Sequence, residues 1–225
     1  MSAFVLKIIA IITMFIDHIG YIFSNGKISY FNYIGRLAFP IFAFQISEGY
    51  LHTKNLKKYF LRLFLFALIS QIPFMLYEKI ITDKFSLNVF FTLFLGLTSI
   101  FIYDKCKYKF LGILAGIAIG LIAQLLHCDY GFFGISIILI FYIFKNNFIN
   151  ASIFFTLATA IRYSIPIIKY GFYPVFIYLF LCTCIPLIFI AGYNGKKGKD
   201  TKYLLYFFYP IHLLLIYGLY LILKL

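Results

Sequence analysis

The chain has 225 residues, of which 64% are hydrophobic and only 12% are charged, and its formal net charge is +13 at pH 7. A soluble domain averages roughly 25% charged residues, so this chain has too few polar side chains to cover itself in water, and a soluble globular fold is excluded in favour of one solvated by lipid. The same composition excludes disorder. Nucleic-acid binding is excluded because most positive charges stand in short clusters between apolar stretches.

Nine apolar segments, separated by short polar clusters, follow one another along the chain. They cover about residues 3–24, 33–51, 59–77, 87–103, 110–127, 131–144, 151–168, 173–192 and 203–223. A helical crossing takes about 20 residues. The sequence therefore predicts an all-α, polytopic integral membrane bundle of eight or nine transmembrane helices, folded as a single domain over residues 1–225. The sixth segment is short for a crossing and is alternatively re-entrant.

Positive residues are concentrated in the loops that nine crossings would place on the side of the N-terminus. These loops hold most of the 20 Lys and Arg, and an excess of Lys and Arg marks the cytoplasmic side of a membrane protein. The pattern predicts a multi-pass protein of the cell membrane, the inner membrane in a bacterium, with a cytoplasmic N-terminus. The four cysteines match no zinc-site spacing and are expected to be apolar filler, so no metal is predicted.

The first segment carries two adjacent polar residues, Asp17 and His18. Ionisable groups cost about 2.5–3.5 kcal/mol each at the centre of a membrane helix, so those that remain usually face a cavity and have a function. A neutral imidazole beside a carboxylate is a typical general base. We therefore expect His18 to act as the base and Asp17 to orient it. Alternatively, Asp17 is a structural residue that pairs with Arg36.

The second segment opens with Arg36 and ends near Glu48. Arg36 is expected at the same depth as Asp17 and His18, as a polar partner of the reacting group or as a charge that reaches the outer surface. Pro40 removes a backbone hydrogen bond and is expected to kink this helix. Glu48 lies near the cytoplasmic end, where the alternative is a partner for the lysines that follow.

Further polar candidates are spread over the later segments. They are Asn88 and Thr92 on one face of the fourth, Asp129 at an outer turn, Arg162 in the seventh and His212 in the ninth. A histidine in the middle of a membrane helix needs a polar partner. Glycines 112, 116 and 120 repeat every four residues and predict a close helix-packing face.

Two basic clusters are expected at the cytoplasmic mouth of the bundle. The first holds Lys54, Lys58 and Arg62, and the second is the glycine-containing loop with Lys196, Lys197 and Lys199. Backbone N–H groups and lysines of such a loop can hold a phosphate. The alternative is that both clusters only set the topology.

Eight different short motifs are distributed over nearly the whole chain. They are Met14-x-x-Asp17-His18-Ile19-Gly20, Ile34-Gly35-Arg36-Leu37-Ala38-Phe39-Pro40, Glu48-Gly49-Tyr50, Gln71-Ile72-Pro73-Phe74, Asn88-Val89, Asp129-Tyr130-Gly131, Tyr193-Asn194-Gly195 and Tyr209-Pro210-x-His212-Leu213. By these motifs the sequence resembles the TraX family, integral-membrane acetylases first associated with pilin N-terminal acetylation. More distantly, His18 and the Tyr-Pro-x-His motif are similar to membrane acyltransferases such as acyltransferase family 3.

The resemblance implies transfer of an acetyl group from cytoplasmic acetyl-CoA to an amine or hydroxyl acceptor in or across the membrane. The acceptor is unknown and could be a peptide N-terminus, a sugar or a small amine. The two basic clusters would then hold the CoA nucleotide, and Arg36, Asn88 or Thr92 would stabilise the oxyanion. Buried ionisable groups would equally suit a small proton-coupled transporter, and a structural membrane subunit is a third class.

Overall fold

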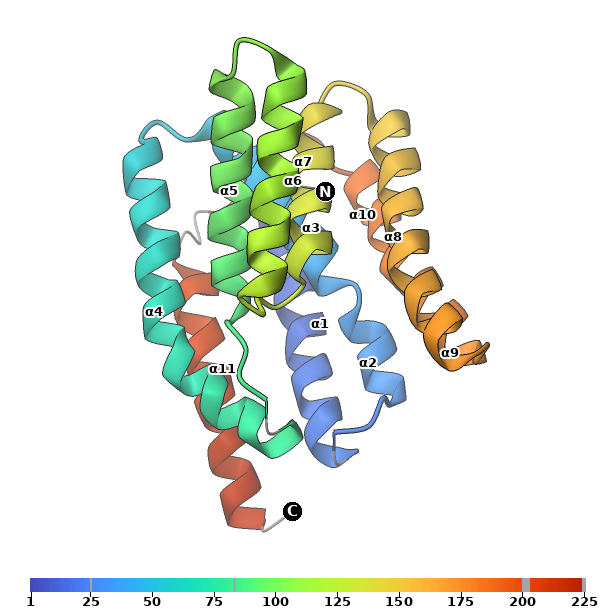
Figure 1. The fold of residues 1–225 in the computed structure, drawn as a ribbon. Helices are drawn as coiled ribbons and strands as arrows, with labels where there is room; N and C mark the ends of the chain where they lie inside the picture. The colour runs from blue at the N-terminus through green and yellow to red at the C-terminus, as the bar shows by residue number, and fades with distance from the viewer. Residues whose placement is uncertain (25, 83, 200–202, 224–225) are drawn as a thin grey trace. The chain divides into compact units, whose positions relative to one another are not determined.

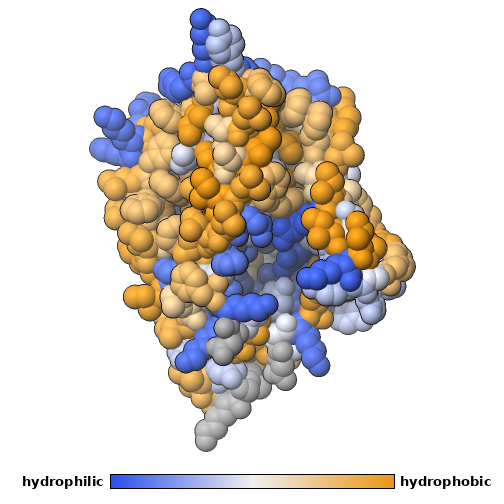
Figure 2. Space-filling model, viewed as in Figure 1, coloured by the Kyte–Doolittle hydropathy of each residue, from blue (hydrophilic) through white to orange (hydrophobic). Residues whose placement is uncertain are grey.

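The protein is described by a computed structural model that covers residues 1–24, 26–82, 84–199 and 203–223. In this described part the chain forms helices and a single isolated bridge, between Leu87 and Cys128. Five helical stretches of the described part, one of them the interrupted stretch Pro174–Ala191, are long and apolar enough to cross a membrane. Hydrophobic side chains cover the helix flanks, and hydrophilic ones gather at the turn between the fifth and sixth helices (Figure 2). The predicted helical membrane bundle is confirmed.

The described chain divides into two compact units, each made of separate stretches of sequence. The first comprises Met1–Phe42, Ile69–Phe85 and Tyr163–Leu225, and the second comprises Ala43–Leu68 and Ser86–Arg162. Three helices, labelled in Figure 1, run from one unit into the other. They are α3 (Ala38–His52), α4 (Leu56–Ile81) and α8 (Phe148–Tyr170). The expectation of one domain over the whole chain stays a prediction.

The first unit also contains five complete helices. Two of the segments predicted from the sequence, 33–51 and 173–192, are each broken into two helices. Its helices are α1 (Ala3–Phe23), α2 (Tyr30–Gly35), α9 (Pro174–Cys184), α10 (Pro186–Ala191) and α11 (Leu204–Leu223). Both breaks have a proline as their cause. A proline lacks an N–H and its ring clashes with the carbonyl four residues earlier, so Pro40 ends a helix near Arg36, and Pro186 ends one near Cys184. The kink predicted at Pro40 is therefore a full break between α2 and α3, one turn before the proline.

The second unit contains the complete helices α5 (Val89–Lys105), α6 (Lys109–Leu125) and α7 (Gly131–Ile143), which pack against one another. The glycine face predicted for α6 is confirmed, because Gly112, Gly116 and Gly120 are all buried. A Cβ atom at these positions would meet Tyr103, Leu139 and Phe132, respectively. α7 has only 13 residues, which is short of the roughly 20 that a crossing takes.

In each unit taken by itself, the contacts at one end agree with segments that alternate in direction. In the first unit, the Ala3 N–H donates to the Lys196 carbonyl over 2.9 Å and the Phe4 N–H to that of Lys197 over 3.0 Å, so the N-terminus and the 192–198 loop share one end. In the second unit, Tyr50 and Tyr142, at the ends of α3 and α7, both donate to the Asp104 carboxylate at the end of α5. The membrane side on which each end lies stays a prediction.

The contact between α1 and α2 depends on glycines that leave no room for a side chain. A Cβ atom at Gly35 would collide with the Asp17 side chain, and one at Gly20 would collide with Phe31. We expect Gly35→Ala to lower the free energy of unfolding by about 1–3 kcal/mol, because overpacking forces neighbours apart. Thermal melting in detergent measures the effect.

The matched control is Gly218→Ala in α11, where a Cβ atom meets nothing within 4 Å. Alanine is favoured over glycine in a helix by about 0.5–1 kcal/mol, so this variant should melt at or above the wild-type temperature. Equal melting temperatures for the two variants would contradict the tight α1–α2 contact.

Candidate functional site

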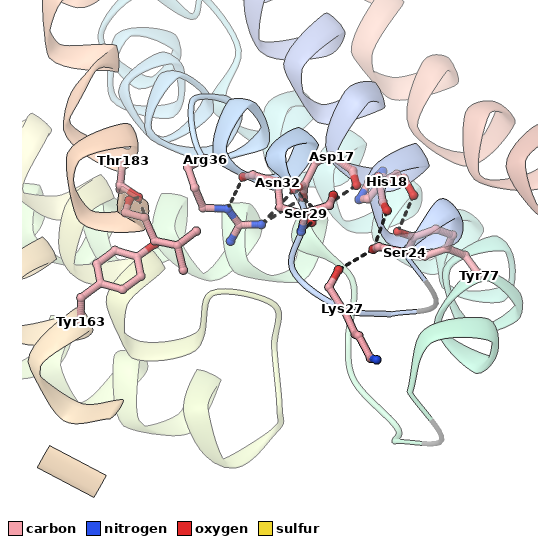
Figure 3. Close-up of polar contacts among 12 residues, drawn as sticks. Asp17, His18, Ser24, Lys27, Ser29, Asn32, Arg36, Tyr77, Tyr163 and Thr183 are labelled. Carbon is pink, nitrogen blue, oxygen red and sulfur yellow. Dashed lines mark hydrogen bonds and ion pairs between the residues drawn. The ribbon is translucent and has the colours of Figure 1, made fainter. Parts of the chain in front are cut away.

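In the first unit, two polar side chains, Asn32 of α2 and Arg36 directly after α2, bond to the Asp17 carboxylate of α1. The Nη2 atom of Arg36 lies 3.1 Å from each carboxylate oxygen of Asp17, and the Asn32 side-chain amide donates to Asp17 Oδ1 over 2.9 Å. Arg36 Nε also donates to the Asn32 backbone carbonyl at 3.2 Å. Figure 3 shows the three side chains converging between the two helices. Asp17 and Asn32 are buried.

This arrangement supports the alternative in which Asp17 pairs with Arg36. A buried charge is tolerated when it is paired and when its remaining lone pairs accept hydrogen bonds, and Asn32 supplies one of those bonds. The short helix α2 ends at Gly35, and this end directs the Arg36 guanidinium back toward Asp17 in α1. Asn32 was missed by sequence reasoning, although its position four residues before Arg36 puts both on one helix face.

The Asp17–Arg36 pair makes a prediction about stability. Removing one partner of a buried ion pair costs about 3–5 kcal/mol, because the other charge is left uncompensated. We expect Asp17→Asn to lower the free energy of unfolding by that order, measured by thermal or denaturant unfolding in detergent. The double variant Asp17→Asn/Arg36→Met should recover much of the loss. Strictly additive losses in the two single variants and the double variant would show that the pair contributes nothing.

The ring of His18 contacts a second histidine from the far end of the chain. His18 Nδ1 lies 2.7 Å from His212 Nε2, and the two rings are nearly parallel with centroids 5.0 Å apart. In the described structure the ring of His18 makes no hydrogen bond to Asp17. The expectation that Asp17 orients His18 is therefore wrong, because Asp17 points to Asn32 and Arg36, and His212 from α11 takes that place.

The tautomers of the pair follow from the hydrogen-bond partners of its ring nitrogens. His212 Nδ1 lies 2.8 Å from the Phe208 carbonyl oxygen, which can only accept, so Nδ1 carries the proton. In the neutral ring, Nε2 of His212 is then an acceptor. His18 Nδ1 must donate to it, and the remaining nitrogen of neutral His18, Nε2, holds a free lone pair. This chain of donors and acceptors leaves one basic nitrogen at the site, on His18.

Aromatic side chains enclose the histidine pair. The Tyr77 hydroxyl donates to the His18 backbone carbonyl over 3.1 Å, and the Tyr77 and His18 ring centroids are 5.0 Å apart. Phe208 stacks on His212 at 4.7 Å, and Tyr209 is almost completely buried beside both histidines. Tyr77 was not predicted from the sequence, since nothing in its own segment distinguishes it.

The second basic cluster lies in the same unit as the histidines. Lys196, Lys197 and Lys199 are exposed in a loop that hydrogen-bonds the start of α1 through backbone groups. Phe4, which is bonded to Lys197, is fourteen residues before His18 in α1. At 1.5 Å per residue this is about 21 Å along the helix axis. Only an elongated molecule could contact both places at once.

The remaining predicted residues belong to the second unit, and three of them meet near the start of α5. Asn88 caps α5, because its side-chain oxygen accepts from the Phe90 N–H over 3.0 Å, and its amide donates to the Ala67 carbonyl over 2.7 Å. The Thr92 hydroxyl donates to the Asp129 backbone carbonyl. Burial and the Asp129 carboxylate raise the pKa of the neighbouring Cys128 thiol to about 11, which agrees with a cysteine that serves as filler.

The other candidates of this unit are separate from that cluster in their contacts. The Arg162 guanidinium lies over the Phe133 ring at 4.5 Å, and Glu48 lies 3.7 Å from His52, one turn later in α3. Arg62 lies over the Tyr59 ring at 5.7 Å. Lys54 and Lys58 are exposed. The functional roles that the sequence predicts for these residues stay predictions.

Comparison with known proteins relates nearly the whole chain to one protein family. A family profile described as TraX protein matches residues 2–220. The probable fimbrial assembly protein FimC, serogroup H1, of Dichelobacter nodosus is 32% identical over 238 residues, which cover 96% of this chain and 94% of that protein. No solved structure matches the chain.

Proposed function

The chain belongs to the TraX family of membrane proteins, and from that premise we propose that it transfers an acetyl group from acetyl-CoA to an amine or hydroxyl acceptor, with His18 as the general base. The observation that carries the proposal is the contact between the two histidines and the Phe208 carbonyl, because the tautomers inferred from it leave His18 Nε2 unprotonated at the site. A base within hydrogen-bond reach of the acceptor is what such a transfer requires.

The proposed reaction has two steps that share one proton. As the acceptor nitrogen or oxygen attacks the thioester carbonyl, its proton moves to His18 Nε2. The tetrahedral intermediate then collapses, the C–S bond breaks, and the CoA sulfur leaves as the thiol with that proton. While His18 is an imidazolium, its Nδ1–H bond to His212 stabilises the charge. Arg36 is the proposed oxyanion donor. Asn88 and Thr92 belong to the second unit, and the same role stays a prediction for them.

Acetyl-CoA suits the distance between the basic loop and the histidines. Its phosphates and its thioester stand at opposite ends of a long pantetheine arm, and the proposed site has lysines at one place and the base about 21 Å away along α1. Lys54, Lys58 and Arg62 belong to the second unit, and the contact with the nucleotide predicted for them from the sequence stays a prediction. This orientation of the donor requires the N-terminal end to be cytoplasmic, in a bacterial inner membrane, because acetyl-CoA is a cytoplasmic metabolite.

The acceptor is proposed only as a chemical class. The name of the Dichelobacter relative connects that protein with fimbrial assembly, so the amino terminus of a fimbrial subunit is one candidate for this chain. A sugar hydroxyl or a small amine satisfies the same chemistry, because each presents a proton that a neutral imidazole can accept as the bond to carbon forms.

Charge reversal at Lys196, Lys197 and Lys199 tests the proposed position of the nucleotide. We expect the triple Lys→Glu variant to bind acetyl-CoA at least tenfold more weakly, and the loss should be larger at low salt, where charges are screened least. Equilibrium binding to purified protein at two salt concentrations measures both effects.

The matched control is Lys27→Glu/Lys79→Glu/Lys169→Glu, which reverses three lysines at the turns expected on the opposite side. It changes the net charge by the same amount and should leave the affinity near that of the wild type. Equal affinity in both triple variants and the wild type would return the 192–199 loop to a purely topological role.

A further inference from the structure

A serine in the middle of α4 has a buried hydroxyl without a partner. Ser70 is completely buried. Its Oγ is one of two buried side-chain atoms for which the described structure provides no hydrogen-bond partner, the other being Arg62 Nε. A buried polar atom that makes no hydrogen bond destabilises the fold, so each such case in a native protein calls for a reason.

Other hydroxyls in the membrane helices avoid this cost by bonding to their own helix. Thr13, Thr159 and Thr183 each donate to the carbonyl four residues earlier, over 2.9, 2.8 and 2.7 Å. The buried Ser99 donates to Gly96 over 2.7 Å. This is the ordinary behaviour of Ser and Thr inside a helix. Ser70 differs from them, because its hydroxyl has no hydrogen-bond partner in the described structure.

The same turn of α4 also lacks one of its usual backbone donors. Pro73 lies inside α4 and has no N–H, so the carbonyl of Ile69 receives no hydrogen bond from position 73. A hydroxyl donor at residue 70 and a carbonyl acceptor at residue 69 lie one residue apart. An amide, with its N–H and C=O, is the neutral group that matches a donor and an acceptor together.

Ser70 is aligned with the histidine site. Tyr77 lies seven residues later in α4, on the same helix face and about 10.5 Å along the axis, and it contacts His18 through its hydroxyl and its ring. A chain that approaches His18 along this part of α4, from the side of Ser70, would pass Ser70 before it reached Tyr77. In the proposed reaction that chain is the pantetheine arm, which is apolar apart from two amides and a hydroxyl.

We propose that the Ser70 hydroxyl hydrogen-bonds an amide of the pantetheine arm of acetyl-CoA and so positions the thioester at His18. The inference rests on the proposed function and adds a specificity determinant for the donor. It makes Ser70 a positioning residue, since it contacts the arm and takes no part in the chemistry.

The test is the kinetics of Ser70→Ala with two acetyl donors. With S-acetylpantetheine, which keeps both amides and lacks the nucleotide, we expect KM to rise about 5- to 10-fold at unchanged kcat, the value of one hydrogen bond. With S-acetyl-2-mercaptoethanol, which has no amide, the variant and the wild type should have the same KM. The melting temperature of the unliganded variant should equal or exceed that of the wild type, because an unpaired hydroxyl has been removed.

Ser99→Ala is the control, because it removes an equally buried hydroxyl that already has a partner. It should lower the melting temperature slightly and leave KM unchanged for both donors. If Ser70→Ala behaves like Ser99→Ala while the wild type still transfers acetyl groups, Ser70 is structural and the inference is overturned, although the proposed function stands. If the wild type uses neither donor nor acetyl-CoA, both the inference and the proposed function fail.

Discussion

Replacing His18 with alanine should reduce acetyl transfer by about 10²–10⁴ while the protein still folds and binds acetyl-CoA, because general-base catalysis contributes that much to the rate. The loss should appear in kcat, since the imidazole Nε2 acts on the acceptor proton and makes no contact required for donor binding. His18→Gln should be as inactive, because an amide preserves size and some hydrogen bonding but cannot take up a proton. Single-turnover transfer to a model amine, together with a binding assay, measures both quantities.

Two controls make this result specific. His52, at the end of α3, is exposed and contacts Glu48, so His52→Ala should have wild-type activity. Melting temperatures of the His18 variants separate loss of the base from loss of the fold. Transfer by His18→Ala at near the wild-type rate would rule out His18 as the base.

His212→Ala should also lose activity, by roughly 10²-fold, although His212 is not placed to touch the acceptor. Without His212 Nε2 as an acceptor, His18 is no longer held in the tautomer that leaves its own Nε2 basic, and its imidazolium loses a stabilising bond. Removing the residue that fixes the tautomer of a catalytic histidine costs up to about 10⁴ in rate. The measurement is kcat with saturating acetyl-CoA, and KM for the donor should change little.

His212→Gln provides the readout that a purely structural role would not produce. The glutamine carbonyl can accept the proton of His18 Nδ1, so this variant should recover part of the activity lost in His212→Ala, at a similar melting temperature. The double variant His18→Ala/His212→Ala should be no slower than His18→Ala alone, since both residues act through one base. Independent, multiplicative losses would contradict a relay between the two rings.

The helical segments could be predicted from the sequence because each is a nearly continuous apolar run. The first segment, predicted over about residues 3–24, is α1 (Ala3–Phe23). The break between α2 and α3 was harder to predict. A proline indicates that a helix is distorted, but the surrounding contacts decide whether the helix bends or ends. Here the guanidinium of Arg36 bonds to Asp17 from the terminus created by the break, and this contact stabilises the broken form.

The candidate site was predicted only in part, for a similar reason. Asp17 and Arg36 lie at the same depth in consecutive segments, so their pairing could be anticipated as one of two alternatives. The contact between His18 and His212 joins residues 194 positions apart, and hydropathy carries no information on which helices are neighbours or on their rotation. The sequence indicated that a histidine in the ninth segment needs a partner, and the structure identifies it.

Binding of acetyl-CoA by the purified protein is the most direct test of the proposed function. Radiolabelled acetyl-CoA should bind the wild-type protein in detergent saturably, at about one molecule per chain, and unlabelled CoA should displace it. His18→Ala should bind equally well, because the base is not part of the binding contacts. Wild-type protein that retains neither acetyl-CoA nor CoA above the background of a denatured sample would contradict the acetyltransferase and favour a proton-coupled transporter, for which the same buried ionisable groups would serve as a proton path.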